Sequence, residues 1–237
     1  MSLVFHERVG FEGRRPSPFS WRIRYALAHK GLLDTPEVEV RPTRFADRPR
    51  IEALSGQRFV PVIEHRGRVV HDSWAIACHL EDAFPDRPSL FGGAIGRGVT
   101  RQLNLWCDTV LLPATRPVLV AEFPAVLDPG DRAYYRSSRE AMFGCTLEAY
   151  AADRPGAIAR LREAAAPLEA LLAEQPWVAG AAAPAYADHL VFSVFQYARL
   201  GCTAELLDPG SALAEWRARM VALHGGLGDR FPAYPAG

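Results

Sequence analysis

The sequence predicts two domains: an α/β domain whose elements follow the order βαβ-ββα, and an all-α helical domain after it. Strand-like apolar runs occur only within residues 1–84, and helical patterns fill residues 94–237. Residues 85–93 between them are rich in proline and glycine and predict a linker. With 237 residues, 49% of them hydrophobic, the chain is long enough to form a substantial core.

A strand, a helix and a second strand begin the α/β domain. The apolar run 3–6 predicts the first strand. From Pro18 onward apolar residues recur at helical spacing, and Gly31 stands where such a helix would end. The alternation at residues 37–40 predicts the second strand. An arginine-rich connector over residues 41–58 follows, which we interpret as a solvated face or as a surface that attracts an anionic ligand.

A hairpin and a helix complete the α/β domain. Residues 59–63 and 69–71 are β-type runs, joined by a tight turn at Arg66-Gly67. Asp72 and Ser73 are residues that typically start a helix, so a helix is expected over residues 74–84, ended by Pro85. The resulting order of elements is that of a thioredoxin-like fold.

The remainder of the chain carries helical patterns separated by proline and glycine. No convincing strand follows residue 94, and no sequence repeat is evident. Helices are expected at about 97–121, 131–151, 156–174, 185–200 and 210–224.

Composition excludes several classes of function. The 27 basic and 27 acidic residues give a net charge of zero, which argues against a nucleic-acid or membrane-surface binder. No apolar run approaches the ~20 residues of a membrane span, and no signal peptide is visible. The four cysteines form no CxxC pair, which indicates a reduced, cytoplasmic protein with all four as core residues. The histidines show no metal-binding spacing, and His65 and His71 are expected at the surface.

The segment Ser17-Pro18-Phe19-Ser20 stands at the predicted strand-to-helix junction. Redox proteins of the glutaredoxin type carry cysteines at such positions, and here both are hydroxyls. A hydroxyl cannot exchange disulfides, because the reactive species is a thiolate, but it can donate a hydrogen bond to one. Because a helix N-terminus also favours an anion, the segment predicts a site for the thiol of a ligand, most obviously glutathione.

Taken together, these motifs resemble the glutathione S-transferase superfamily over nearly the whole chain. The resemblance implies that Ser17 stabilises the thiolate of glutathione, the co-substrate. It further implies that Val60, before a cis-Pro61, pairs with the cysteinyl part, and that Asp72 and Ser73 hold the γ-glutamyl end. Phe59 stands where many members have a polar contact for the glycyl end, so Arg58 or Arg44 would serve there. Ala187-Asp188 would be structural, and the resemblance implies a homodimer.

Two groups within the superfamily are similar to this chain. Residues 17–31 resemble the zeta class of cis-trans isomerases, with Ser17-Pro18-Phe19 in place of Ser-Ser-Cys. Residues 60–63, 72–77 and 85–91 are more similar to the bacterial lignin β-etherase group and its fungal serine-type relatives, and residues 131–140 extend that similarity.

The function that follows is a glutathione transferase without a metal, acting on a small hydrophobic electrophile. The thiolate would attack an electrophilic carbon in a pocket between the domains. The alternatives are β-aryl ether cleavage, cis-trans isomerisation, a disulfide-type reaction that uses a protein cysteine, and non-catalytic binding of a hydrophobic ligand. The residues expected to line the pocket are Phe19, Trp106, Tyr135, Met142 and Phe143.

Overall fold

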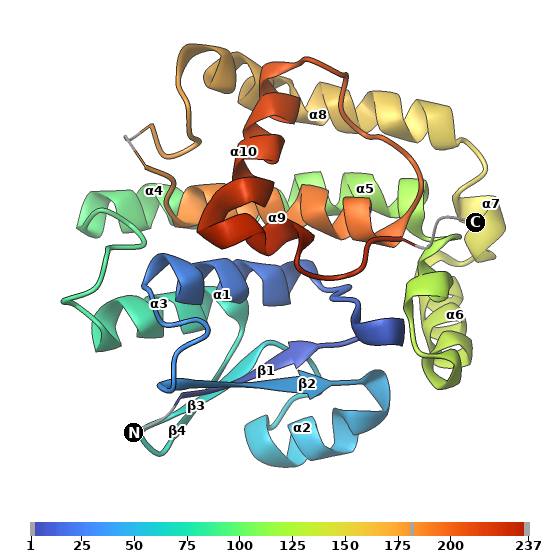
Figure 1. Cartoon of the computed structure of the whole chain (residues 1–237). Coiled ribbons are helices and arrows are strands. Elements are labelled where there is room, and N and C mark those ends of the chain that lie inside the picture. The colour runs from blue at the N-terminus through green and yellow to red at the C-terminus, as the bar shows by residue number, and fades with distance from the viewer. Residues whose placement is uncertain (1–2, 181–182, 235–237) are drawn as a thin grey trace.

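A small sheet lies at one end of the molecule, and helices α1 (Pro18–His29) and α3 (Ser73–Ala83) separate it from the helical half of the chain (Figure 1). The computed structural model describes residues 3–180 and 183–234. Above α1 and α3 lies a layer that contains α9 (Tyr186–Gly201), and α8 (Arg154–Glu174) forms the far side of the molecule. The predicted fold class is confirmed: a thioredoxin-like α/β domain is followed by a helical domain.

The sheet has four strands in the order β2-β1-β3-β4. β1 pairs with β2 in parallel and with β3 antiparallel, and β3 pairs antiparallel with β4. Arg66 and Gly67 both have positive φ, of 52° and 73°, which is the geometry of a two-residue turn that matches the twist of a hairpin. The strands are β1 (Leu3–Arg8), β2 (Val38–Thr43), β3 (Val62–His65) and β4 (Arg68–His71).

Local sequence signals fix both ends of α1. Ser17 caps the helix and Pro18 occupies its first turn, where proline loses no hydrogen bond. Gly31 follows the helix with a φ of 64°, a conformation that glycine adopts without steric cost. The buried face of α1 includes Trp21 and Tyr25, and the helix packs on α9.

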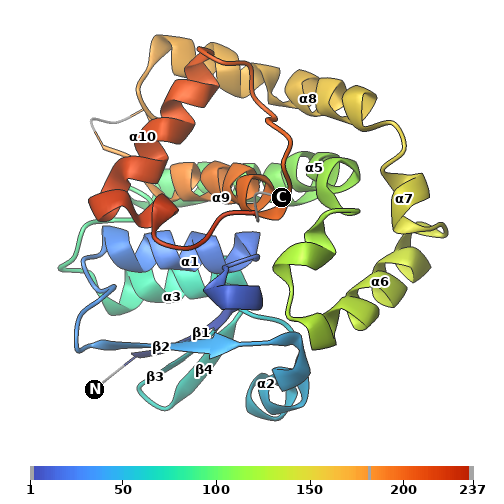
Figure 2. The same cartoon turned by 45° about the vertical axis from the view of Figure 1, so that its right-hand side comes forward.

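Helix α2 (Arg48–Ser55) lies within the arginine-rich connector, where no helix was predicted. It covers the face of the sheet opposite to α1 (Figure 2). Its only buried residue is Ile51, so it has almost no apolar periodicity to read. The remaining signals are Pro49 in the first turn and Gly56, which ends the helix with a φ of 73°.

The helical half follows the predicted pattern with two differences. The expected helix 97–121 is continuous but contains a π-helical segment, Cys107–Leu111. The expected helix 131–151 is split in two, because Gly144 ends the first part with a φ of 70°. The helices not yet given are α4 (Ala94–Trp106), α5 (Leu112–Leu119), α6 (Pro129–Phe143), α7 (Leu147–Tyr150) and α10 (Ala212–Gly226). Within the described part of the chain, none of the helices is both long and apolar enough to span a bilayer.

Asp188 is the polar centre of the helical core. Its fully buried carboxylate accepts hydrogen bonds from the backbone N–H groups of Val178 (2.7 Å), Ala179 (3.2 Å) and Ala185 (3.0 Å). A fourth comes from the indole of Trp216 at 2.9 Å. Burial raises the pKa of Asp188, and these hydrogen bonds act in the opposite direction by favouring the charged form. The geometry agrees with the structural role implied for this residue.

Polar contacts join the two domains across α1. The fully buried guanidinium of Arg22 lies 2.8 Å from the carboxylate of Asp108 in the π-helical segment, and its Nε donates to Ser193 of α9 at 3.1 Å. The Tyr25 hydroxyl donates to the Met220 carbonyl of α10 at 2.9 Å. These contacts fix α1 against the helical half.

Two predictions about the surface and the core are wrong. His65 is buried rather than exposed, because its ring stacks on Phe84 and its Nδ1 lies 2.9 Å from Nε2 of His79. Cys145, expected in the core, is exposed, since it follows the bend between α6 and α7.

Candidate active site

Ser17 lies at the N-terminus of α1, where it borders a cavity. Its backbone is extended (φ −132°, ψ 116°), and its Oγ accepts a hydrogen bond from the Ser20 N–H at 3.2 Å. Because that bond uses a lone pair, the hydroxyl hydrogen remains, and no group in the described residues accepts it. The first turn of α1 also presents N–H groups that have no partner within the helix. Ser17 can therefore donate to an anion that enters the cavity.

Ser20 has a different role from Ser17. It is buried at the first turn of α1. Its Oγ accepts the Arg8 N–H at 3.2 Å, which ties the first turn of α1 to the end of β1. Of the two serines in the motif, Ser17 alone borders the cavity.

The segment before β3 forms a second wall of the cavity. The Val60-Pro61 peptide bond is cis, as the sequence comparison with the superfamily implied. Val60 and Phe59 both border the cavity, and Phe59 is 74% exposed.

Asp72 and Ser73 start α3, outside the cavity. Asp72 Oδ1 accepts the N–H groups of Trp74 and Ala75, each at 3.0 Å. No described residue hydrogen-bonds to Oδ2, and the residue is exposed, so this oxygen can accept from a ligand. Ser73 is buried, and its carbonyl accepts from the Tyr186 hydroxyl at 3.1 Å.

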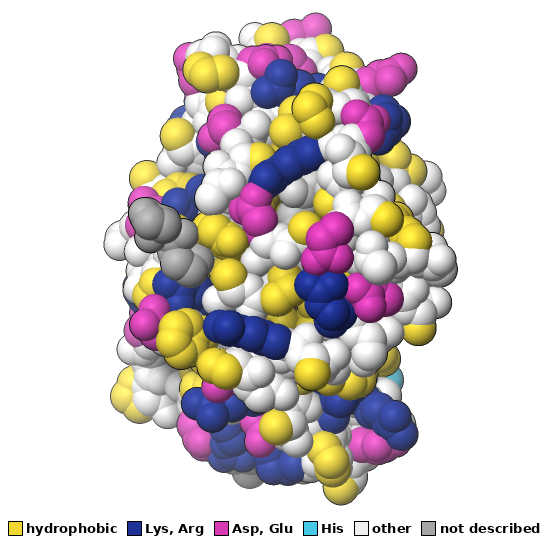
Figure 3. Space-filling view, turned by 90° about the vertical axis from the view of Figure 1, so that its right-hand side faces the viewer, with side chains coloured by type: hydrophobic (Ala, Val, Ile, Leu, Met, Phe, Trp, Pro, Cys, Tyr) yellow, Lys and Arg dark blue, Asp and Glu magenta, His cyan; other side chains and the backbone are white. Residues whose placement is uncertain are grey.

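The cavity has a volume of about 540 Å³ and lies between the α/β domain and the helical half. The α/β domain contributes Ser17, Phe19 and Val60, and helices α5, α6 and α9 form the opposite wall. Figures 1 and 2 place α6 on the side of the molecule toward which the N-terminus of α1 points. On this side, hydrophobic side chains lie between those of Lys or Arg and of acidic residues (Figure 3). Ser17 thus borders a largely apolar space to which several aromatic side chains contribute.

Family comparisons identify both halves of the chain. Residues 16–83 match the glutathione S-transferase N-terminal domain, and residues 101–227 match the glutathione S-transferase C-terminal domain. The chain belongs to the glutathione S-transferase family. Members of this family use glutathione, the ligand that the hydroxyl motif predicted.

Curated relatives of this transferase family match shorter stretches. A probable glutathione S-transferase of Oryza sativa subsp. indica is 39% identical over 101 residues, which are 40% of this chain and 42% of the rice protein. The match thus spans about two fifths of the rice relative's length. A probable glutathione transferase of Aplysia californica is 33% identical over 90 residues, which are 37% of this chain and 91% of that protein.

Solved transferase structures share the fold over the whole chain. A glutathione transferase of Phanerochaete chrysosporium superposes with a TM-score of 0.81 at 23% identity, covering 93% of this chain and 96% of the other. A glutathione S-transferase of Ceriporiopsis subvermispora, solved in complex with glutathione, gives a TM-score of 0.79 at 20% identity, covering 98% and 99%.

Of the five residues predicted to line the pocket, the structure brings four to the wall of the cavity. Phe19, Tyr135, Met142 and Phe143 border the cavity. Trp106 instead packs against the main core at the end of α4, away from the cavity wall. Arg58 also lies off the wall, and its exposed side chain pairs with Glu52 at 3.0 Å.

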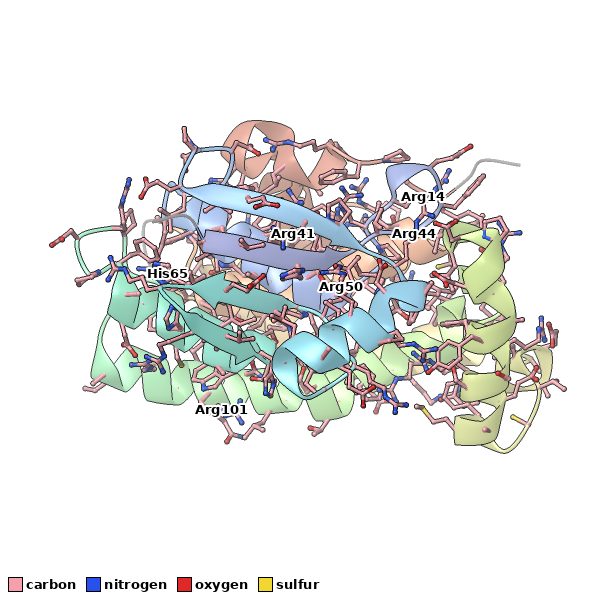
Figure 4. The ribbon with its side chains drawn as sticks, turned by 90° about the horizontal axis from the view of Figure 1, so that it is seen from below. Arg14, Arg41, Arg44, Arg50, His65 and Arg101 are labelled. Atoms are coloured by element: carbon pink, nitrogen blue, oxygen red, sulfur yellow. The ribbon has the colours of Figure 1, made fainter. Side chains whose placement is uncertain are left out.

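The arginine-rich stretch is mostly neutralised by nearby acids. Arg41 lies 2.7 Å from Glu39, and Arg44 lies 3.1 Å from Asp128. Figure 4 shows Arg41 over the sheet and Arg50 at α2, both on the face away from α1. For Arg41 and Arg50, this arrangement favours the interpretation of the stretch as a solvated face.

Sequence reasoning missed several cavity residues, because they come from elements far apart in the chain. Arg8 ends β1, Arg116 lies on α5, Arg139 on α6 and Tyr197 on α9. Burial lowers the pKa of Arg8 to about 10. Burial raises the pKa of Tyr197 to about 12, and the positive charges of Arg139 and Arg116 oppose that shift. No local sequence pattern marks these residues. They come together only because β1 and the three helices pack around the cavity.

Metal-ligating residues are scattered. In residues 3–180 and 183–234, no group of three or more His, Cys, Asp or Glu side chains is arranged to hold a metal ion.

Proposed function

We propose that this protein is a serine-type glutathione transferase that joins the thiolate of glutathione to a hydrophobic electrophile. The observation that carries the proposal is the Ser17 hydroxyl, which caps α1 through its oxygen and keeps its hydrogen for a ligand in the cavity. Donation of this hydrogen to the glutathione sulfur favours the thiolate and lowers the thiol pKa.

Glutathione would extend from Ser17 toward the start of α3. The backbone of Val60, next to the cis-Pro61, would pair with the cysteinyl part. The free Oδ2 of Asp72 would accept from the ammonium group, and the N-terminus of α3 at Ser73 would face the γ-glutamyl carboxylate. Arg58 would pair with the glycyl carboxylate. Its exposed ion pair with Glu52 would have to break, which costs about 1 kcal/mol at most.

The thiolate would then attack an electrophilic carbon held in the cavity. A carbon–sulfur bond forms, and either a leaving group departs with the bonding electrons or a double bond is saturated by addition. The aromatic wall excludes water from the nucleophile, and orientation of the two reactants lowers the barrier further.

The test is glutathione binding by calorimetry together with turnover of a halonitrobenzene, a β-aryl ether and maleylacetone. Conjugation of the halonitrobenzene supports the proposal. Glutathione binding without turnover of any of the three would assign the chain to non-catalytic binding, and exclusive turnover of the ether or of maleylacetone would assign it to cleavage or isomerisation. Absence of glutathione binding would remove the proposal altogether.

We also propose a cytoplasmic homodimer. The spacing of the cysteines supports the cytoplasmic location, and the resemblance to the family supports the dimer. Helix α4 supports the dimer because it exposes Ile95 (85%) and Val99 (68%) one turn apart. Light scattering at micromolar concentration should give twice the 26.1 kDa chain mass; a monomer mass would contradict the proposal.

A further inference from the structure

The wall of the cavity carries positive charge and no described negative charge. Three of its residues are the arginines Arg8, Arg116 and Arg139, and no described residue on the wall is Asp or Glu. The guanidinium of Arg8 is already occupied: it donates to the Thr43 carbonyl at 3.2 Å and lies 4.1 Å from the centre of the Phe45 ring. The two arginines of the helical half are different.

Arg116 and Arg139 have no carboxylate partner within ion-pair distance in the described part of the chain. Arg139 donates only to the neighbouring Ser138 hydroxyl, at 3.3 Å, and lies 5.1 Å from the centre of the Tyr135 ring. On the same helix, Arg136 does not border the cavity and pairs with Glu140 (2.9 Å) and Glu148 (2.8 Å). Of the three arginines on α6, Arg136 is neutralised by carboxylates, whereas Arg139 on the cavity wall and Arg132 off the wall have no ion pair within the described residues.

Arg116 and Arg139 both border the cavity from the helical half, on α5 and α6. Both act on the same two phenols: burial raises the pKa of Tyr135 and of Tyr197, and the charges of Arg139 and Arg116 oppose the shift at each. Together with Tyr197 of α9 and Tyr135 of α6, they belong to the part of the wall that the helical half contributes.

Glutathione, as proposed above, does not need these arginines. Its thiol would meet Ser17, and its other end would leave the cavity toward Asp72 and Ser73, which are not part of the wall. The free cations thus face the second substrate. An arginine fork fits a carboxylate in two-point contact, and the ring of such a compound would lie among the aromatic side chains.

We propose that the acceptor substrate is an aromatic electrophile that carries a carboxylate, held by Arg116 and Arg139 while Phe19 and Phe143 contact its ring. The reaction step rests on the proposed function, whereas the binding step does not. With a chloronitrobenzoate, the glutathione sulfur forms a bond to the ring carbon and the carbon–chlorine bond breaks. Chloride leaves with the bonding electrons, and the thiol proton goes to solvent.

The first experiment measures binding without chemistry. Nitrobenzoate and nitrobenzamide, which differ in charge but hardly in shape and lack the chloride leaving group, are titrated into the protein with and without glutathione. The benzoate should bind at least about tenfold more tightly than the amide. Arg116→Gln and Arg139→Gln should each remove most of that preference, and Arg136→Gln, the matched control on α6, should retain it.

The second experiment measures turnover of a chloronitrobenzoate and its amide, each divided by its uncatalysed rate with glutathione. The expected result is a preference for the benzoate that falls about tenfold in Arg139→Gln, with the KM for glutathione unchanged. Equal affinity of the protein for the charged nitrobenzoate and the neutral nitrobenzamide would overturn the proposal. So would a loss of glutathione affinity in both variants, which would assign the arginines to glutathione. Charge-selective binding without turnover would sustain this proposal and contradict the transferase function.

Discussion

Replacement of Ser17 by alanine should change the pH dependence of catalysis rather than abolish it. The variant loses one hydrogen bond to a thiolate, and a hydrogen bond to a charged group contributes about 1.5–3 kcal/mol. At 1.36 kcal/mol per pKa unit, the pKa of the bound thiol should rise by about one to two units. Turnover at neutral pH should therefore fall roughly 10- to 100-fold. Raising the pH should restore part of it.

The structure provides a matched control for the folding effect of this change. Ser211 caps α10 as Ser17 caps α1, and its Oγ accepts the Ala214 N–H at the same distance, 3.2 Å. Each serine-to-alanine change should lower the free energy of unfolding by about 1 kcal/mol, the typical loss of a cap. Only Ser17→Ala should move the pH profile.

The assay is kcat/KM with a halonitrobenzene across pH, together with the thiolate absorbance of bound glutathione. An unchanged rate and an unchanged pH profile in Ser17→Ala would show that the backbone N–H groups alone hold the thiolate. An inactive Ser20→Ala that is fully folded would show that the wrong serine was assigned, because Ser20 bonds only within the fold.

Three further results are expected. Asp72→Ala should weaken glutathione binding by about 2–3 kcal/mol in calorimetry, whereas Asp153→Ala, which removes the cap of α8, should leave it unchanged; equal affinity in both would remove Asp72 from the site. Asp188→Ala should destabilise the fold by about 3–5 kcal/mol in denaturant unfolding, because it leaves four donors, the buried Trp216 indole among them, without their acceptor; a loss below about 1 kcal/mol would contradict this. Burial lowers the pKa of His189 well below 6.5. Near pH 6.5 the unfolded chain therefore binds a proton at this residue and the folded chain does not, so the free energy of unfolding should fall as the pH drops through about 6.5. His189→Phe should make that fall shallower, and an unchanged slope would count against the assignment.

The elements with strong end signals could be predicted from the sequence. Ser17-Pro18 and Asp72-Ser73 start helices, and Gly31 ends one, by interactions within a few residues. Such signals do not depend on the rest of the fold. Helix α2 was missed because it buries only Ile51, which leaves no periodicity to detect.

The cavity could be predicted only in part. Ser17, Val60 and Phe19 belong to motifs that are contiguous in sequence. Arg116 and Tyr197, which are 81 positions apart in the sequence, border the same cavity because α5 packs on α9. The burial of His65 has the same origin, because it depends on side chains contributed by α3 and the residue after it.

The buried Arg22 also limits how the two halves of the chain can be exchanged. Its charge belongs to the α/β half, and its partners Asp108 and Ser193 belong to the helical half. Cutting the chain at the linker would leave the Arg22 guanidinium without its partners, on an apolar surface that includes Trp21 and Tyr25. The halves should therefore unfold in one cooperative transition. A chimera that takes its helical half from a relative would need that relative's residues on the facing side of α1 as well, whereas the cavity side of α5 and α6 can diversify without this constraint.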